Sequence, residues 1–217
     1  KNLIAEIFNE EKLFKELDIQ YKELTTNINT IKINTTDINI NELKENLVKD
    51  FISWSGRIDL LVNNASSFYP TPIGTITENH WNDLIGTNLK GPLFITQAAS
   101  DALRKAHGSV INLIDVHTRS PLKNHPAYSS AKAGLKMLTR SLAKDLAPEI
   151  RVNGISPGAI LWPEDGISEE AKKSILEQIP LNRTGSPQDI ADCVLFLLNQ
   201  GNYITGQIIA VDGGRSV

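Results

Sequence analysis

Two patterns of hydrophobic and polar positions alternate along the chain. Short apolar runs rich in β-branched residues are separated by longer stretches in which apolar residues recur every three or four positions. The short runs are typical of buried parallel strands, and the longer stretches are typical of the amphipathic helices that cover them. This alternation predicts an α/β fold with a doubly wound parallel sheet. The predicted strands are 30–33, 58–62, 109–114, 151–155 and 207–211, with a weaker candidate at 3–8.

Four stretches have the periodicity of a helix. In the first of them, Leu43, Leu47 and Phe51 lie four residues apart and form one apolar stripe. In the last of them, Ser186 is placed to cap the helix and Pro187 to open it. A chain of 217 residues without repeats or a linker is expected to form one domain, 1–217. The predicted helices are 40–54, 78–104, 127–146 and 187–199.

Composition narrows the choice of ligand. The net charge of -3, without a basic cluster among aromatic residues, gives no reason to expect a nucleic-acid partner. No apolar run reaches the ~20 residues that span a bilayer, and we expect no membrane partner and no metal site. The single cysteine, Cys193, lies in an apolar run and is interpreted as a buried, inert thiol, which fits a reducing cytoplasm. The expected ligand is a small neutral or anionic metabolite.

Tyr128 and Lys132 form the strongest local chemical signal. They lie four residues apart in a predicted helix, so that the phenol and the ammonium share one face. A cation beside a phenol lowers its pKa, which suits proton transfer near neutral pH. A chance pairing of a half-buried tyrosine with a solvated lysine remains open for this pair alone.

Polar residues directly follow three of the predicted strands. Asn63-Asn64-Ala65 comes after strand 58–62, Asp115 after strand 109–114, and a loop ending in Pro157-Gly158 after strand 151–155. Ligands of open parallel sheets bind at the carboxyl ends of the strands. These segments are therefore expected to line one site together with Tyr128 and Lys132.

The order of these motifs resembles that of the short-chain dehydrogenase/reductase family, from about residue 30 to the end. The matching motifs are Asn63-Asn64-Ala65, Asn88, Tyr128 with Lys132, Pro157-Gly158 and Val211-Asp212-Gly213-Gly214. Two features resemble the pteridine reductases within that family: the run 63–72, and Asp115 where most members have serine. The segment 156–163 is similar to the bacterial branch of that subgroup. The fold implied is Rossmann-like.

The resemblance implies a role for each motif residue. Tyr128 would donate the proton, and Lys132 would hold the nicotinamide ribose and tune the pKa of Tyr128. Asn88 would bind a water near Lys132 in a proton relay. An equally good interpretation is that its side-chain amide only forms hydrogen bonds with the backbone of a helix. Phe68 would stack on a flat pterin, and Asp115 would share with Tyr128 the delivery of a proton to a ring nitrogen. Expected substrate contacts are Ser66, Phe68, Asp115 and Tyr128. Expected cofactor contacts are Asn34, Thr35, Asn64, Ala65, Ser66, Ile114, Tyr128, Lys132, Pro157, Gly158 and Ile160.

The beginning of the chain departs from the family pattern. No glycine precedes Gly56, and the sequence starts at Lys1. We expect a strand, a Gly-rich turn and a helix, roughly 30 residues, to precede Lys1. The alternative is a protein without a phosphate loop that does not bind a dinucleotide.

The resemblance implies NADPH as the cofactor and a homotetramer with helices 78–104 and 127–146 at its interfaces. Asn9, Glu10 and Glu11 follow the presumed second strand of the fold, where an NADP enzyme often has an arginine. The acidic residues there would repel a 2′-phosphate, so NADH stays open. The leading hypothesis is a reductase of a dihydropterin or dihydrofolate-like substrate. A reductase of another carbonyl substrate and a non-catalytic ligand sensor are the alternatives.

Overall fold

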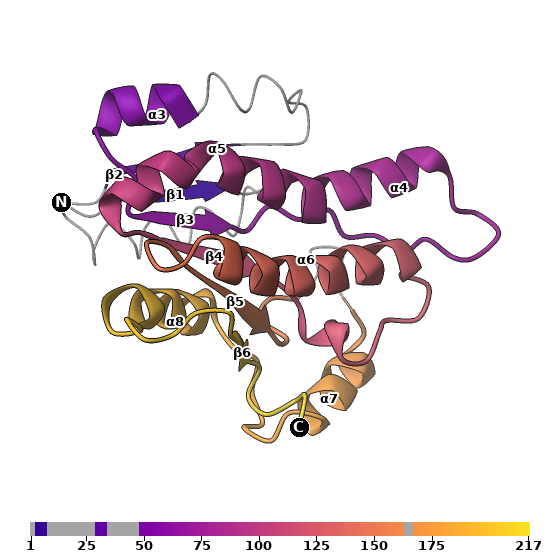
Figure 1. Ribbon diagram of the computed structural model, residues 1–217. Helices are drawn as coiled ribbons and strands as arrows, with labels where there is room; N and C mark the ends of the chain where they lie inside the picture. The colour runs from indigo at the N-terminus through magenta and orange to yellow at the C-terminus, as the bar shows by residue number, and fades with distance from the viewer. Residues whose placement is uncertain (1–2, 8–28, 34–47, 163–166) are drawn as a thin grey trace.

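The computed structural model describes residues 3–7, 29–33, 48–162 and 167–217. Within them, six parallel strands form one sheet in the order β2-β1-β3-β4-β5-β6 (Figure 1). The predicted doubly wound sheet is confirmed, and the predicted strands correspond to observed ones with ends that differ by up to two residues. The strands are β1 (Leu3–Ile7), β2 (Asn29–Ile33), β3 (Leu60–Asn63), β4 (Ser109–Leu113), β5 (Arg151–Pro157) and β6 (Ile208–Val211).

Six α-helices, one π-helix and one 3-10 helix accompany the described strands. The predicted helix 78–104 is interrupted by η2, a π-helix that widens the turn between α4 and α5. The sequence analysis did not predict α7 or the 3-10 helix η3 (Val116–Thr118), and residues 40–47 of the first predicted helix lie outside the described residues. Among the described helices, none is long and apolar enough to cross a membrane. The helices are α3 (Val48–Ser55), α4 (Glu78–Ile85), η2 (Gly86–Lys90), α5 (Gly91–Ala106), α6 (Pro126–Asp145), α7 (Glu169–Glu177) and α8 (Pro187–Asn199).

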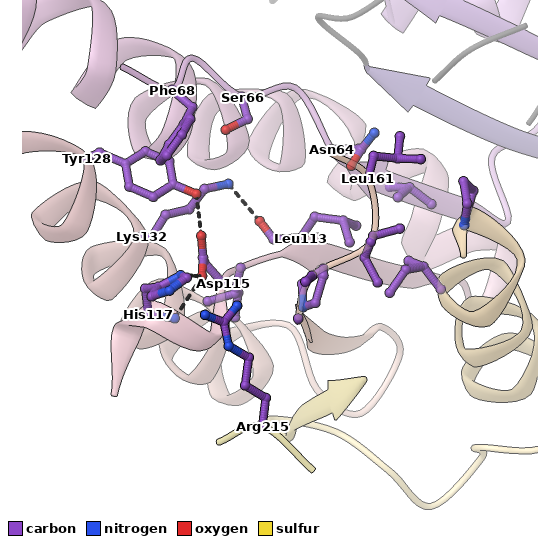
Figure 2. A pocket seen from close by; sticks show the side chains of 18 of the residues that line it. Asn64, Ser66, Phe68, Leu113, Asp115, His117, Tyr128, Lys132, Leu161 and Arg215 are labelled. Carbon is purple, nitrogen blue, oxygen red and sulfur yellow. Dashed lines mark hydrogen bonds and ion pairs between the residues drawn. The ribbon is translucent and has the colours of Figure 1, made fainter. Parts of the chain in front are cut away.

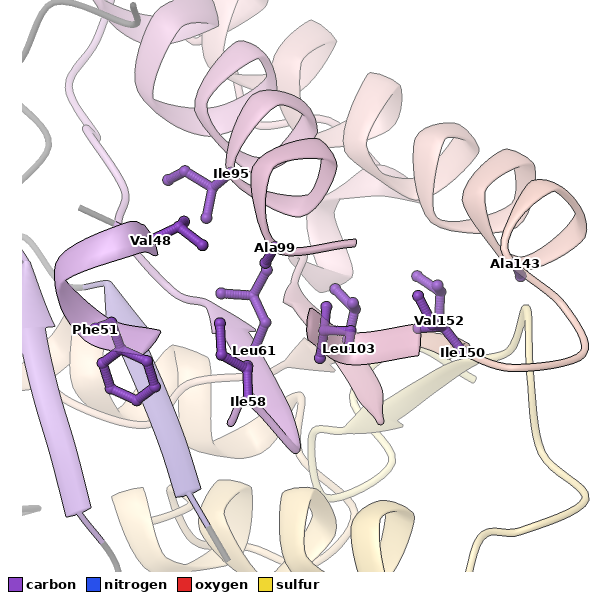
Figure 3. Packing of buried hydrophobic residues seen from close by; sticks show 11 residues of the cluster. Val48, Phe51, Ile58, Leu61, Ile95, Ala99, Leu103, Ala143, Ile150 and Val152 are labelled. Atoms are coloured by element: carbon purple, nitrogen blue, oxygen red, sulfur yellow. The ribbon is translucent and has the colours of Figure 1, made fainter. Parts of the chain in front are cut away.

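Helices cover both faces of the sheet because successive side chains on each strand point in opposite directions. On β3, Leu61 belongs to a buried cluster with residues of α3, α5 and α6, shown in Figure 3. Leu60 and Val62 belong to a second cluster with Val194 and Leu197 of α8. A strand that is apolar at every position, as β3 is up to Val62, is therefore buried on both sides.

A chain of buried hydrogen bonds joins β3, β4 and α6 near the carboxyl edge of the sheet. Asn63 Nδ2 donates to Asn112 Oδ1 at 2.7 Å, and Asn112 Nδ2 donates to Thr139 Oγ1 at 2.9 Å. All three residues are buried. Buried amides are costly unless they are paired, so this chain favours one placement of α6 against the strand ends. It thereby helps to position Tyr128 and Lys132, which α6 carries.

Helix α8 begins where the sequence predicted. Ser186 Oγ accepts a hydrogen bond from Asp189 N at 3.3 Å, and the Asp189 carboxylate accepts one from Ser186 N at 2.7 Å. Pro187 is the first helical residue. This reciprocal cap satisfies two backbone donors and fixes the start of a helix that lies beside the site described below.

Candidate active site

A cavity of about 440 Å³ lies at the carboxyl edge of the sheet, where β3, β4 and β5 end. Its wall consists of the segments that directly follow these strands, side chains of α6 and α8, and the carboxyl-terminal tail (Figure 2). The cavity is where ligands of open parallel sheets are expected to bind. Of the residues predicted for the site, it is lined by Asn64, Ser66, Phe68, Ile114, Asp115, Tyr128, Lys132, Pro157, Gly158 and Ile160.

Tyr128 and Lys132 lie one turn apart on α6, and both side chains reach this cavity. Both residues are buried. Lys132 Nζ donates a hydrogen bond to the backbone oxygen of Leu113 at 3.0 Å. Burial lowers the pKa of Lys132 to about 8, although the charge of Asp115 acts in the opposite direction. The solvated lysine of a chance pairing is therefore excluded.

Tyr128 donates its phenolic hydrogen to Asp115 Oδ2 at an oxygen–oxygen distance of 2.6 Å. Burial, together with the charge and hydrogen bond of Asp115, raises the pKa of Tyr128 well above its usual value. The pKa of Tyr128 is therefore raised overall, whereas the sequence analysis expected a lowered value; the contribution of Lys132 to this pKa stays a prediction. The ammonium is 5.8 Å from the centre of the phenol ring, whereas the carboxylate touches the hydroxyl and so has the larger effect.

Asp115 is the anion of the cavity. Burial alone would raise the pKa of this carboxyl, but hydrogen bonds from His117 and Tyr128 outweigh it and the pKa is lowered. Asp115 is therefore ionised at neutral pH and accepts hydrogen bonds. The prediction that Asp115 itself supplies a proton is corrected accordingly: in this geometry Tyr128 carries the hydrogen, and Asp115 holds and orients it.

Ser66 and Asn88 connect the loop after β3 to the π-helix η2. Ser66 Oγ donates to Asn88 Oδ1 at 2.7 Å, while Asn88 Nδ2 donates to the backbone oxygens of Ser67 and Leu84 at 2.9 and 3.0 Å. Among the described residues, the side-chain hydrogen bonds of Asn88 thus hold this loop in place rather than reach Lys132. Its role in a water relay stays a prediction.

Phe68 stands at the mouth of the cavity, 55% exposed. Its ring stacks on His125, with centroids 4.9 Å apart and an interplanar angle of 10°. Its edge-to-face contact with Tyr128 has a centroid distance of 4.8 Å. An exposed aromatic ring next to the reactive phenol offers apolar surface to a flat ligand.

The remaining predicted residues fall into two groups. Ala65 does not line the cavity and packs against the buried cluster under α3 and α5. Asn34 and Thr35, like Glu10 and Glu11, lie outside the described residues.

Gly158 lets the loop after β5 pass close to the end of β6, since a Cβ there would lie 2.7 Å from Asp212 Cα.

Sequence reasoning missed several residues of the wall. His117 lies two positions after Asp115 and contacts its carboxylate, and that spacing was the available signal. Arg215 belongs to the short carboxyl-terminal tail. It also lines the cavity, and its side chain reaches toward Asp115 and His117 (Figure 2). Apolar residues Leu161, Ile190 and Val194 also contribute. Only folding brings these segments to the same edge, so no local pattern pointed to them.

The fold and the tyrosine–lysine pair define an oxidoreductase of the Rossmann-like class, and comparisons with known proteins agree. A family model described as "Enoyl-(Acyl carrier protein) reductase" matches residues 9–216. The chain belongs to the short-chain dehydrogenase/reductase family, whose members use NAD(P)H. An apo SCOR enzyme from Clostridium thermocellum has a similar structure, with a TM-score of 0.85 and 27% identity over 100% of this chain and 93% of that one.

Two curated relatives carry different names. The chain is 40% identical over 172 residues to the 3-oxoacyl-[acyl-carrier-protein] reductase FabG of Staphylococcus aureus, covering 77% of this chain and 70% of that protein. It is 37% identical over 191 residues to pteridine reductase 1 of Leishmania tarentolae, covering 77% of this chain and 65% of that protein. The comparisons therefore define the family but leave the substrate to be argued from the site.

The cavity fits the nicotinamide end of such a cofactor. Lys132 Nζ has three hydrogens, and among the described residues the Leu113 oxygen is its one hydrogen-bond acceptor. A buried ammonium with free donors is suited to the vicinal hydroxyls of a ribose. The Asn64 side chain, which also lines the cavity, adds an amide donor and acceptor on the β3 side.

Proposed function

We propose that this protein is an NADPH-dependent reductase of dihydropterins or dihydrofolate-like substrates. The observation that carries the proposal is the ionised carboxylate of Asp115, which lies 2.6 Å from the hydroxyl of Tyr128 inside the cavity. A bound nicotinamide would supply the hydride. The residues of this chain would bind the ring, orient it and provide the proton.

A carboxylate in this place favours a ligand that presents N–H groups. Oδ1 of Asp115 receives two hydrogen bonds from His117, and Oδ2 receives one from Tyr128. A carboxylate has about four acceptor positions, so roughly one remains for the ligand. The amino group and ring N–H of a pterin are donors of the required kind. An oxyanion that develops during reduction of a ketone would instead be repelled by the charge of Asp115.

Tyr128 is the proton donor in this scheme. Its raised pKa keeps the hydroxyl protonated at neutral pH, and its hydrogen, which is donated to Asp115 Oδ2 in this structure, can turn to a ligand bound in the cavity. When a ring nitrogen binds, the hydroxyl can transfer this proton to it as the hydride arrives at the neighbouring carbon. The buried ammonium of Lys132 then lies close enough to stabilise the phenolate that remains.

Reduction of a 3-oxoacyl thioester is the second candidate, favoured by the 40% identity to the Staphylococcus aureus reductase. We expect kcat/KM for dihydrobiopterin or dihydrofolate to exceed that for an acetoacetyl thioester by on the order of 10²-fold, because only the pterin can pair with the carboxylate. Steady-state oxidation of NADPH and of NADH with each substrate measures this. A preference for the thioester would replace the proposal with the second candidate, and turnover of neither would favour a sensor.

Lys132→Ala should weaken NADPH binding and lower kcat, because it removes the buried donor proposed for the ribose. We expect the dissociation constant to rise about 10- to 100-fold, the effect of losing hydrogen bonds to a charged group. In the parent protein the ammonium loses its proton as the pH rises through about 8, so NADPH affinity should fall above that pH. Calorimetric titration across pH tests both effects. The exposed Lys144 on the same helix provides a matched control, Lys144→Ala. Unchanged affinity in Lys132→Ala would remove the ribose role.

A further inference from the structure

His117 lines the cavity and contacts Asp115, but it neither donates nor accepts the proton that is transferred in the proposed reaction. It lies in η3, directly after β4, and Asp115 caps that short helix. Asp115 Oδ1 accepts a hydrogen bond from the backbone N of His117 at 2.7 Å, and the ring Nδ1 of His117 lies 2.7 Å from the same oxygen. The other oxygen of the carboxylate faces Tyr128 (Figure 2). The three side chains therefore form a continuous His117–Asp115–Tyr128 chain.

The ionised carboxylate determines which nitrogen of the ring carries hydrogen. A carboxylate accepts but does not donate, so Nδ1 of His117 must be a donor. It donates in the neutral ring and in the protonated ring alike, because only Nε2 differs between the two forms. No hydrogen bond to Nε2 comes from the residues that the structure describes, and the side chain is 24% exposed. The contact with Asp115 is thus independent of the charge of His117.

This contact restricts the rotation of the carboxyl group. The terminal torsion of an aspartate is broad, so an unheld carboxylate would sample orientations in which neither oxygen faces Tyr128. Two donors on Oδ1 leave Oδ2 directed at the phenol. Proton transfer is sensitive to such placement, since the donor must be within hydrogen-bond reach and aligned.

We propose that His117 is a positioning residue, which acts through Asp115 to hold the hydroxyl of Tyr128 in the place from which it reaches the substrate. The proposal deepens the proposed function and rests on it for the kinetic test. Lys132 and Arg215 also place positive charge around the cavity. The test must therefore separate the hydrogen bond of His117 from its charge.

Three substitutions make that separation. Asn places an uncharged N–H near the position of Nδ1, Gln extends its amide to the position of Nε2, and Leu has no donor. We expect His117→Leu and His117→Gln to lower kcat for dihydropterin about 10-fold, the effect of one hydrogen bond to a charged group, with KM within about 3-fold of the parent. His117→Asn should recover kcat to within about 3-fold. His107→Asn is the matched control: His107 caps α5 in a left-handed conformation that Asn tolerates, away from this cavity.

A spectroscopic measurement tests the contact without turnover. The chain has four histidines, so the imidazole nitrogen-15 resonances of His117 are assigned by their loss in His117→Asn. We expect Nδ1 to be protonated in the parent at neutral pH, and to shift when Asp115→Asn removes the negative acceptor. An unprotonated Nδ1 in the parent would contradict the geometry.

The outcomes are distinguishable. A parent that reduces no dihydropterin contradicts the proposed function, while the nitrogen spectrum still decides the contact between His117 and Asp115. If the parent is active and His117→Leu keeps its kcat, or His117→Asn is as slow as His117→Leu, the positioning role is wrong. A tenfold loss in Leu and Gln with recovery in Asn supports it. Circular dichroism and NADPH affinity establish that each variant is folded.

Discussion

Replacing Tyr128 by phenylalanine is expected to lower kcat by roughly 10²- to 10⁴-fold, the usual contribution of a positioned acid–base group. The substitution removes the hydroxyl that lies 2.6 Å from Asp115 and keeps the ring that packs against Phe68. The protein should remain folded, because Asp115 lines the cavity and water can replace the lost donor. Steady-state and single-turnover kinetics with dihydropterin measure the loss.

Tyr69→Phe is the control for the same chemical change. Tyr69 also donates to a carboxylate, Asp83, at 2.9 Å, and burial together with this carboxylate raises its pKa to about 12. Tyr69 does not line the cavity. We expect its loss to leave kcat near that of the parent. A Tyr128→Phe variant with the kcat of the parent would show that another group provides the proton and would remove the assignment of Tyr128.

Much of the fold could be predicted from the spacing of hydrophobic residues along the chain. Strands such as β3 are apolar at nearly every position because both of their faces are covered. The start of helix α8 is indicated by Ser186 and Pro187. Helix α7 was missed because it is short, mostly charged or polar, and has no buried residue. The π-helix was missed because one wider turn hardly disturbs the periodicity of the helices on either side.

Residues of the site could be predicted from the sequence where a polar residue lies just after the end of a strand. Asn64 directly follows β3 and Asp115 lies just after β4, and parallel strands bring such residues to one edge of the sheet. The pKa values of the site residues were less predictable. The pKa of Tyr128 is raised by burial and by the carboxylate that touches its hydroxyl, and a sequence shows neither the burial nor which charge is nearer. Arg215 reaches the cavity only because β6 ends beside β5.

Asp115→Ser is expected to lower kcat/KM for dihydropterin by on the order of 10²-fold or more, while NADPH affinity changes little. A serine side chain is too short to contact both His117 and Tyr128, and it provides no negative acceptor for the N–H groups of a pterin. Turnover of a 3-oxoacyl thioester should be retained or increased, because the charge that opposes an oxyanion is gone. The opposite effects of this one substitution on the two substrates would therefore distinguish the two candidate functions.

The pH profile gives a second readout of the same change. Asp115 contributes to the raised pKa of Tyr128, so its removal should let the phenol lose its proton at lower pH. Activity that requires a protonated Tyr128 should then decline at lower pH in the variant than in the parent. Asp115→Asn, which is neutral but has nearly the same shape, isolates the effect of charge from that of size. If Asp115→Ser reduces pterins as fast as the parent at every pH, the carboxylate has no part in pterin reduction. The functional assignment would then return to a short-chain reductase of another carbonyl substrate.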